Sequence, residues 1–302
     1  MGNCAKRVIV VNPLAKSGRA LSIFNQLNLD LSQYSIVETE GPGDGILKAR
    51  KALEEGAQMI IAAGGDGTVH EVVNGMAGSN VTLGILPIGS VNVLAKELGI
   101  PSDIQKALDV IENGRVMNMD LAVMSSRDGG AENKKYFVQL GGVGLDAEVV
   151  RSVTQAMKNR WGPFSYVMGF MKACRSWRAN ITVKMRNQTL YQVQSLLIGN
   201  GCFYGGAFKI FKKAERADGL LDILIFRGVG LKSFLTFLLS GFRANQKTIQ
   251  YFQEEEIVLD SNEPIPIELD GEFVGFTPAR FHVLARALAV MIPKERARSC
   301  PS

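Results

Sequence analysis

Short apolar runs alternate with segments of helical periodicity over about the first 120 residues, a pattern that is typical of βαβ units. The run Met59–Ala63 is apolar throughout, as expected of a strand that is buried on both faces of a parallel sheet. In chain order, the pattern predicts strand Arg7–Val11, helix Gly18–Leu27, strand Tyr34–Thr39, helix Gly43–Glu55, strand Met59–Ala63, helix Thr68–Met76, strand Thr82–Leu86 and helix Val91–Leu98. The first part of the chain is therefore expected to be an α/β domain with a parallel sheet.

Strand patterns dominate from about residue 120 onward. The expected strands are Tyr136–Gly141, Ile181–Arg186, Tyr191–Ile198, Leu220–Phe226, Ile257–Asp260 and Arg280–Leu284. Helical patterns interrupt them at Asp146–Lys158, Phe164–Ser176 and Leu231–Arg243. This part predicts a β-rich domain over residues 121–286, with a few helices. A last strand, Leu288–Ile292, is expected to return to the first domain, which then comprises residues 1–120 and 287–302.

The composition agrees with a two-domain soluble enzyme. A length of 302 residues is long for one core, and 46% hydrophobic with 21% charged residues is ordinary for a globular protein. The strongly apolar stretch Phe234–Phe242 is far shorter than the roughly 20 residues of a membrane-spanning helix. Four scattered cysteines and no secretory signal favour the cytoplasm, and only two histidines argue against a structural zinc site.

The net charge of +5 is unevenly distributed. Eight Lys and Arg residues and no Asp or Glu lie between Arg151 and Arg186, which we call the basic segment. Such a segment can bind nucleic acid or an anionic membrane surface. It is equally compatible with a solvated face of ordinary helices and strands.

Four unusual turns follow the four expected parallel strands. They are Asn12-Pro13, Thr39, Gly64–Thr68 and Pro87–Asn92. Ligands of open parallel sheets bind beyond the carboxyl ends of the strands, where these turns are expected. Glycines allow backbone N–H groups to approach a phosphate, and a helix N-terminus attracts anions. A single glycine turn would only shape the chain, but four on one edge predict a nucleotide site.

The kind of nucleotide site is narrowed by what surrounds the glycines. The glycine-rich turn follows the third strand rather than the first, which differs from the dinucleotide fingerprint, and no P-loop motif is present. Asp66 lies within this turn, and a carboxylate beside phosphates is unfavourable unless a cation lies between them. These observations predict a polyphosphate with Mg²⁺.

Gly64–Thr68, followed by Glu71 and Asn74-Gly75, resembles the nucleotide loop of the diacylglycerol kinase catalytic domain family, which includes bacterial lipid kinases and sphingosine kinases. Further matching motifs are Asn12-Pro13 with Ser17-Gly18, Pro87-x-Gly89-Ser90-x-Asn92, Gly205-Gly206, Ala217–Asp222 and Asp270-Gly271-Glu272. The resemblance spans about residues 6 to 290. NAD kinases share the glycine loop, so the ordered set of motifs is more specific than the loop alone.

The resemblance implies a phosphofructokinase-like α/β domain and a β-sandwich domain with ATP in the cleft between them. It implies the ATP-binding residues Asn12, Thr39, Gly64, Gly65, Asp66, Gly67, Thr68, Val69, His70, Ser90 and Asn92. It also implies a Mg²⁺ site at Glu215, Asp218 and Leu220, with some ligands being backbone carbonyls, and Glu272 as the proton acceptor with Asp270 required beside it.

Some positions depart from the family pattern. Ser90 replaces the usual Thr and keeps the hydroxyl, whereas Val93 replaces a common Asp. In sphingosine kinases the loop Asp has the base role, so Asp66 competes with Glu272 for that role here. Without the resemblance, Asp270-Gly271 would be read as a surface hairpin turn.

The resemblance thus implies ATP- and Mg²⁺-dependent phosphorylation of a lipid hydroxyl, with diacylglycerol as the first choice and phosphatidic acid as the product. Three alternatives stay open: a sphingoid-base or other lipid kinase, a soluble-substrate kinase of the NAD kinase type, and a nucleotide-binding membrane-associated sensor without turnover. The expected partners are a lipid at the membrane surface and, through the basic segment, an anionic membrane, with no nucleic acid. Peripheral membrane association of a cytoplasmic protein is expected, and a homodimer is considered.

Overall fold

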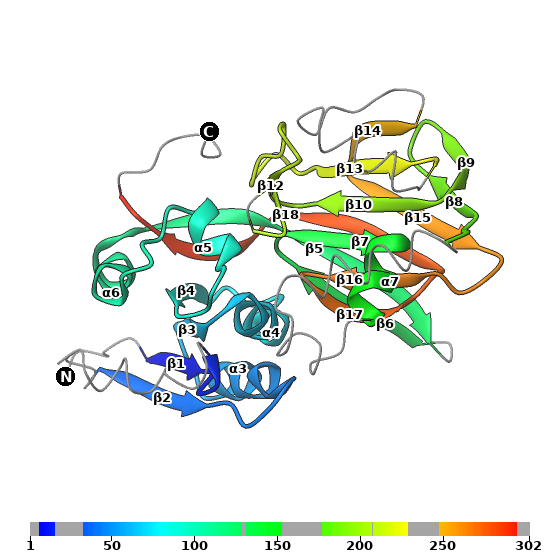
Figure 1. Cartoon of the computed structure of the whole chain (residues 1–302). Coiled ribbons are helices and arrows are strands. Elements are labelled where there is room, and N and C mark those ends of the chain that lie inside the picture. The colour runs from blue at the N-terminus through cyan, green and yellow to red at the C-terminus, as the bar shows by residue number, and fades with distance from the viewer. Residues whose placement is uncertain are drawn as a thin grey trace.

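The computed structural model describes residues 6–15, 33–128, 131–152, 177–206, 208–228 and 248–294. The expected helices Gly18–Leu27, Phe164–Ser176 and Leu231–Arg243 lie outside these ranges, as does most of the basic segment. Figure 1 shows an α/β part that contains the N-terminal strands and a β-rich part beside it.

Parallel strands and their covering helices form the α/β part. The strands are β1 (Arg7–Val11), β2 (Tyr34–Glu38), β3 (Met59–Gly64) and β4 (Thr82–Pro87), and they are ordered β2-β1-β3-β4. The helices are α3 (Asp44–Glu54), α4 (Asp66–Met76), α5 (Val93–Glu97) and α6 (Ile104–Asn113). Strand β1 pairs with β2 on one side and with β3 on the other. The chain therefore passes from β2 across β1 to β3, and the strand order reverses at β1. This reversal creates the crevice in which ligands of such sheets bind.

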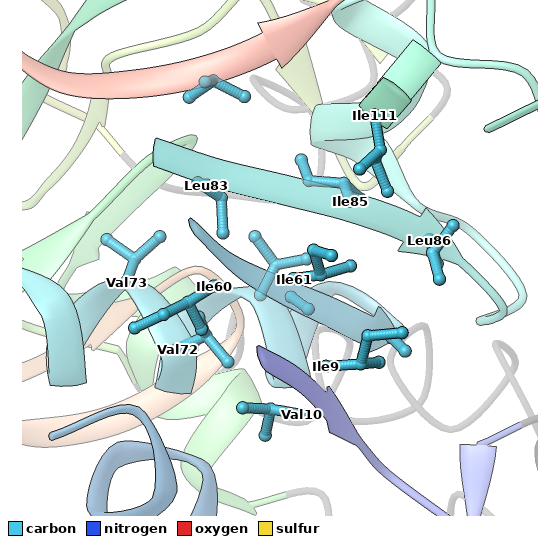
Figure 2. Close-up of a cluster of buried hydrophobic side chains, with 14 of the residues drawn as sticks. Ile9, Val10, Ile60, Ile61, Val72, Val73, Leu83, Ile85, Leu86 and Ile111 are labelled. Atoms are coloured by element: carbon cyan, nitrogen blue, oxygen red, sulfur yellow. The ribbon is translucent and has the colours of Figure 1, made fainter. Parts of the chain in front are cut away.

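The apolar residues of these strands form the core of the α/β part. Side chains from β1, β3, β4 and α4 gather in one cluster, together with Ile111 of α6 (Figure 2). Helices α3 and α4 approach closely because Gly75 has no side chain: a Cβ there would lie 2.6 Å from the Cβ of Ala49. The strands predicted from the sequence are confirmed, with ends that differ by at most one residue.

Two sheets form the β-rich part. The ten-stranded sheet continues from β4 through β18 (Ala279–Ile292), β15 (Glu256–Ser261), β8 (Ile181–Lys184) and β9 (Thr189–Val193), with β5 (Arg115–Asp128) and β6 (Ala131–Phe137) branching from β18. The second sheet has the order β14 (Ile249–Glu254), β13 (Leu221–Phe226), β10 (Ser195–Gly199), β7 (Leu140–Val143), β16 (Pro266–Leu269) and β17 (Glu272–Phe276). Helix α7 (Leu145–Ser152) and the short pair β11 (Phe203–Tyr204) and β12 (Phe208–Lys209) complete it.

The two sheets enclose a second apolar cluster, which includes the edge-to-face pair Phe137 and Phe281. Its members come from both sheets, as in a sandwich. The expected fold class, an α/β domain followed by a β-sandwich domain, is confirmed.

Strand β18 connects the two parts. It pairs with β5 from Ala279 to Ile292 and with the parallel strand β4 at Val290 and Leu83. The expected strands Arg280–Leu284 and Leu288–Ile292 are therefore one strand, with an irregularity around Arg286, whose φ is +54°. The boundaries predicted at residues 120 and 287 fall inside β5 and β18, where the sheet is continuous.

Two expected strands are each divided in two. The pattern at Tyr136–Gly141 becomes β6 and β7, and the pattern at Tyr191–Ile198 becomes β9 and β10. Cys202 also differs from the expectation of scattered free thiols, because it is fully buried and disulfide-bonded. No helix in the described part of the chain is long and apolar enough to span a bilayer.

Candidate functional site

A cleft of about 340 Å³ lies beyond the carboxyl ends of β1, β2, β3 and β4, with the first residue of β17 in its wall. All four turns that the sequence singled out contribute to it. Its lining comprises Asn12, Leu14, Ala15, Thr39, Gly41, Pro42, Gly65, Gly67, Thr68, Glu71, Gly89 and Glu272. Both parts of the molecule therefore contribute to one cleft.

Glycines allow the loops after β3 and β4 to cross at close range. The N–H groups of Ile88 and Gly89 donate to the carbonyl oxygen of Gly64, at 3.0 and 3.1 Å. A Cβ on Gly89 would lie 2.4 Å from the Cα of Gly65, and a Cβ on Gly64 would lie 2.2 Å from the Oγ1 of Thr68. A side chain at Gly89 would force the two loops apart, and one at Gly64 would collide with Thr68, so this wall of the cleft is built from backbone.

Polar side chains hold the remaining turns in place. The Nδ2 of Asn12 donates to the Oγ1 of Thr68 at 3.4 Å, and its Oδ1 accepts from the N–H of Leu14 at 3.0 Å. The N–H of Thr39 donates to the carbonyl of Val11 at 2.9 Å. These bonds bring the amide of Asn12 and the hydroxyl of Thr68 to the floor of the cleft.

Glu71 in α4 fixes the start of α3. Its two carboxylate oxygens accept from the N–H groups of Gly43 and Gly45, at 2.7 and 2.8 Å. Gly43 has a φ of +84°, in the region that favours glycine. The sequence analysis quoted Glu71 in a motif without predicting a role for it. The spacing of residues along the sequence does not show that Glu71 lies in the cleft wall.

Asp66 points away from the cleft lining, toward the start of α5. One of its carboxylate oxygens accepts from the N–H of Val93 at 2.6 Å. Burial raises the pKa of Asp66, and the backbone N–H groups of Val93, Asn92 and Leu94 partly offset that rise. The sequence analysis expected a cation to offset the charge of Asp66. In the structure, backbone N–H groups at the start of α5 stabilise this carboxylate.

Asp270 and His70 form a buried pair between the two parts of the molecule. The Nδ1 of His70 lies 3.1 Å from Asp270, and both side chains are about nine-tenths or more buried. Asp270 also accepts from the N–H groups of Val138, Gln139 and Leu140, at 3.0, 2.9 and 3.0 Å. These bonds occupy the break between β6 and β7 and explain why the predicted strand divides there.

Each residue of this pair shifts the pKa of the other. Burial alone would raise the pKa of Asp270, but the hydrogen bond and charge of His70 and the backbone donors outweigh burial and lower it. Burial alone would lower the pKa of His70, but the hydrogen bond and charge of Asp270 raise it overall. Neither side chain is in the cleft lining.

Asn74, one turn after His70 in α4, makes a second connection to the β-rich part. Its Nδ2 donates to the carbonyl of Tyr136 at 2.8 Å, and its Oδ1 accepts from the N–H of Tyr136 at 2.9 Å. The amide therefore matches both backbone groups of one residue in β6. The sequence analysis quoted Asn74 in a motif without predicting this role.

Glu272 is the carboxylate that β17 contributes to the cleft. It is exposed, and its Oε1 lies 3.4 Å from the position that a Cβ on Gly67 would occupy. The two acidic residues of the motif Asp270-Gly271-Glu272 thus lie in different places. Asp270 is buried against His70, whereas Glu272 faces the glycine loop across the cleft.

Three further predicted nucleotide-binding residues lie outside the cleft lining. Val69 belongs to the apolar core, and Asn92, with a φ of +54°, donates from Nδ2 to the carbonyls of Pro87 and Gly89 at 3.1 and 2.7 Å. Ser90 is exposed and is not in the cleft lining.

The predicted metal residues lie in the loop before β13, apart from the nucleotide cleft lining. Glu215 and Asp218 are exposed, and Leu220 lines a separate cavity of about 630 Å³ together with Lys184 and Arg186. Partial loss of solvent around its carboxyl raises the pKa of Asp218, and the charges of Asp120 and Glu215 add to the rise. The N–H of Leu220 partly offsets it. Within the described residues, no group of three or more His, Cys, Asp or Glu side chains is arranged to hold a metal ion.

Comparison with known proteins agrees with this geometry. Residues 6–124 match the diacylglycerol kinase catalytic domain, and residues 141–292 match the YegS C-terminal NAD kinase beta sandwich-like domain. The chain is 31% identical to a diacylglycerol kinase of Bacillus subtilis (strain 168), in a match that covers 92% of this chain and 91% of that protein. It is 30% identical to a diacylglycerol kinase of Staphylococcus carnosus (strain TM300), over 87% of this chain and 86% of the relative.

Solved structures share the fold. A crystal structure of a diacylglycerol kinase from Bacillus anthracis str. Sterne superposes with a TM-score of 0.72 at 21% identity, over 95% of this chain and 96% of that one. Yeast NADH kinase complexed with NADH gives a TM-score of 0.57 at 9% identity, over 96% of this chain and 84% of that one. The sequence matches span most of the chain and include the loops that line the cleft, so the protein is a kinase that belongs to the diacylglycerol kinase family.

Proposed function

We propose that this chain transfers the γ-phosphoryl group of ATP to the free hydroxyl of diacylglycerol, in the presence of Mg²⁺, and releases phosphatidic acid and ADP. The observation that carries the proposal is the position of Glu272 across a narrow cleft from Gly67. Phosphoryl transfer needs a phosphate cradle, a cation and a group that orients the attacking hydroxyl, and this cleft offers residues for each of these needs.

The backbone of the glycine loop suits the phosphates of ATP. Gly65, Gly67 and Gly89 leave the cleft wall without side chains, and α4 begins at Asp66, so its N-terminus adds a positive dipole. Asn12, Thr39 and Thr68 supply an amide and two hydroxyls in the same cleft.

The carboxylates that line the cleft fit a Mg²⁺ ion that is bound mainly through phosphates. Mg²⁺ in kinases is usually held by one or two carboxylates, water and the substrate phosphates, so it requires no dedicated cage of side chains. Glu272 and Glu71 are the carboxylates in the lining, and both oxygens of Glu71 already accept from Gly43 and Gly45, so the phosphates and water would supply most of the ligands. When bound, Mg²⁺ would neutralise phosphate charge.

Glu272 is the proposed proton acceptor. The hydroxyl oxygen attacks the γ-phosphorus, the bond from that phosphorus to the ADP oxygen breaks, and the hydroxyl proton passes to Glu272. Asp66 is a weaker candidate because its carboxylate is directed to Val93 and lies outside the lining. Asp270 accepts four hydrogen bonds, so we assign it a positioning role for the turn that carries Glu272.

A second cation at Glu215, Asp218 and the carbonyl of Leu220 also stays a proposal. It rests on the resemblance and on the negative charge that Asp120 and Glu215 place near Asp218. Contact of the basic segment with an anionic membrane and formation of a homodimer stay predictions.

Substitution of Glu272 tests the proposed chemistry. Glu272→Gln keeps the shape of the side chain but removes the proton acceptor, so the turnover rate with diacylglycerol in mixed micelles should fall by a factor on the order of 100 or more while ATP binding persists. Glu263→Gln, an exposed glutamate before β16, is the matched control and should leave the rate unchanged. Equal rates for Glu272→Gln and the wild type would contradict the assignment.

The substrate class is tested in the same assay. Mg-ATP is supplied with diacylglycerol, monoacylglycerol, a sphingoid base or NAD, and the proposal expects diacylglycerol to be preferred. Turnover of NAD without detergent would support a soluble-substrate kinase instead. ATP and vesicle binding without turnover of any acceptor would support a sensor.

A further inference from the structure

Two aromatic rings lie exposed on β17, immediately after Glu272. Phe273 and Phe276 are 40% and 42% exposed. Their rings meet edge to face, with centroids 5.3 Å apart and planes at 71°. They form an aromatic pair at the edge strand of the six-stranded sheet.

A bulge places both rings on one face of that sheet. Residues three apart in a regular strand point to opposite faces. Here Phe273 pairs with Glu268 and Phe276 pairs with Pro266, with a register shift between the two pairs that leaves Val274 without a partner. Cross-strand partners share a face, so both rings lie on the face that carries Glu268.

This face is the outer one, away from the core between the two sheets. Ile267 and Leu269 belong to that core, so Glu268 points outward, where its carboxyl and that of Asp146 in α7 both lie beside Gly142. Helix α7 packs on β16 and β17, and the structure describes it as far as Ser152 (Figure 1). Arg151 in its last turn is also the first residue of the basic segment.

The position of the pair next to Glu272 indicates its partner. The free hydroxyl of a diacylglycerol lies at the boundary between hydrocarbon and water, so a kinase that acts on it must bring its proton acceptor to that boundary. Aromatic side chains favour this boundary, and basic residues are attracted to anionic headgroups. Glu272 pairs with Leu269 and therefore leaves the opposite face of β17 from the rings, but it lies only one residue from Phe273 along the edge strand. Insertion of this edge strand at the boundary would bring the rings and the proton acceptor to a similar depth.

We propose that Phe273 and Phe276 insert into the surface of a lipid bilayer and so place Glu272 at the depth of the substrate hydroxyl. This inference rests on the proposed lipid kinase function. It specifies the bilayer, rather than another protein, as the partner of this edge strand.

A double substitution tests the proposal. Phe273→Ser/Phe276→Ser should reduce binding of the full chain to vesicles of phosphatidylcholine, phosphatidylglycerol and diacylglycerol by about tenfold or more, because two large apolar side chains no longer leave water. Sedimentation measures the binding. The ratio of activity on vesicle diacylglycerol to activity on monomeric dihexanoylglycerol should fall by a similar factor. Tyr191→Ser, which removes a 63% exposed aromatic residue from β9, is the matched control and should change neither value.

Two results would overturn the proposal: vesicle binding equal to that of the wild type, or equal losses on vesicle and monomeric substrate, which would make the rings structural. A second variant tests the proposal without removing an aromatic side chain. In Phe276→Trp, vesicles with brominated lipid should quench the added fluorescence relative to the wild type, and unquenched emission would also overturn the proposal. Quenching without phosphorylation of any lipid would refute the proposed lipid kinase function and would support the bilayer contact.

Discussion

Two buried carboxyl groups lie beneath the turn that carries Glu272. Glu268 accepts from the N–H of Gly271 at 2.7 Å, and Asp146 of α7 accepts from the hydroxyl of Tyr204. A Cβ on Gly142 would lie 2.6 Å from an oxygen of each carboxyl, so the absence of a side chain there makes room for the pair. Two negative charges side by side in a buried site are unfavourable, so we expect the two carboxyls to hold one proton between them at neutral pH.

This proton makes stability depend on pH. Burial, followed by the charge of Asp146, raises the pKa of Glu268 well above its ordinary value of 4.5, and burial also raises the pKa of Asp146. A carboxyl with a raised pKa in the folded state stabilises the protein fully below its unfolded pKa. That contribution is lost as the pH rises from about 4.5 through the folded pKa of the pair.

We therefore predict that Glu268→Gln flattens the pH dependence of stability. The amide can accept from Gly271 as Glu268 does and can donate toward Asp146, but it has no proton to lose. Relative to the wild type, the variant should gain about 1.4 kcal/mol of unfolding free energy per pH unit above pH 4.5, until the pair ionises. Thermal melts from about pH 5 to 9 measure this, with Glu263→Gln as a control whose profile should follow the wild type. Parallel profiles for Glu268→Gln and the wild type would disprove the shared proton.

At the scale of secondary-structure elements, α3 and α4 are joined at their ends. The N-terminus of α3 has no side-chain cap of its own, and Glu71 from α4 accepts the N–H groups of Gly43 and Gly45 instead. The carboxylate also faces the positive end of the α3 dipole. The orientation of two helices beside the cleft thus depends on one side chain.

Removal of that carboxylate should destabilise the fold. Glu71→Ala leaves two backbone N–H groups without their partner, and we expect a loss of about 1–3 kcal/mol in unfolding free energy. Urea denaturation measures it. Glu54→Ala, an exposed glutamate in the last turn of α3, should change stability by less than about 0.5 kcal/mol. Similar effects of the two substitutions would show that Glu71 does not anchor α3.

Local patterns were sufficient for most of these elements and insufficient for others. The parallel strands were predictable because each is a short apolar run. Helix α6 was missed although its signal was present: Asp103 is a cap residue, and Ile104, Ala107, Leu108 and Ile111 have helical spacing. The short strands β16 and β17 were missed because Pro266 and the Asp270-Gly271 turn resemble loop sequence.

The candidate site shows the same limit. The sequence identified the loops, because glycines and polar residues follow each strand. It could not show that Asp270 ends β6 by accepting from Val138, more than a hundred residues away, or that Asn74 pairs with the backbone of Tyr136. Such contacts depend on how the two parts of the chain meet, and a local pattern contains no information about them.

On the scale of the whole molecule, the two parts share structure rather than only a boundary. Strands β5 and β18 pair along their length. Arg115 pairs with Ile292 in the α/β part, and Ser126 pairs with Ala279 in the β-rich part. A buried ion pair adds to this connection: Arg216 lies 2.6 Å from Glu97 of α5, and both side chains are less than 5% exposed. Separation of the parts would break the sheet and leave these charges unpaired, which costs several kcal/mol.

We therefore predict one cooperative unfolding transition for the whole chain. Loss of either part would expose the core of the other along β18, so neither part is expected to persist alone. In differential scanning calorimetry, the calorimetric and van't Hoff enthalpies should agree. Binding of a non-hydrolysable ATP analogue with Mg²⁺ in the cleft, whose wall includes Glu272 from the β-rich part, should shift the entire peak upward. Two resolved peaks, with only the first shifted by nucleotide, would show that the shared strands do not couple the two parts and that the cleft is held by the α/β part alone.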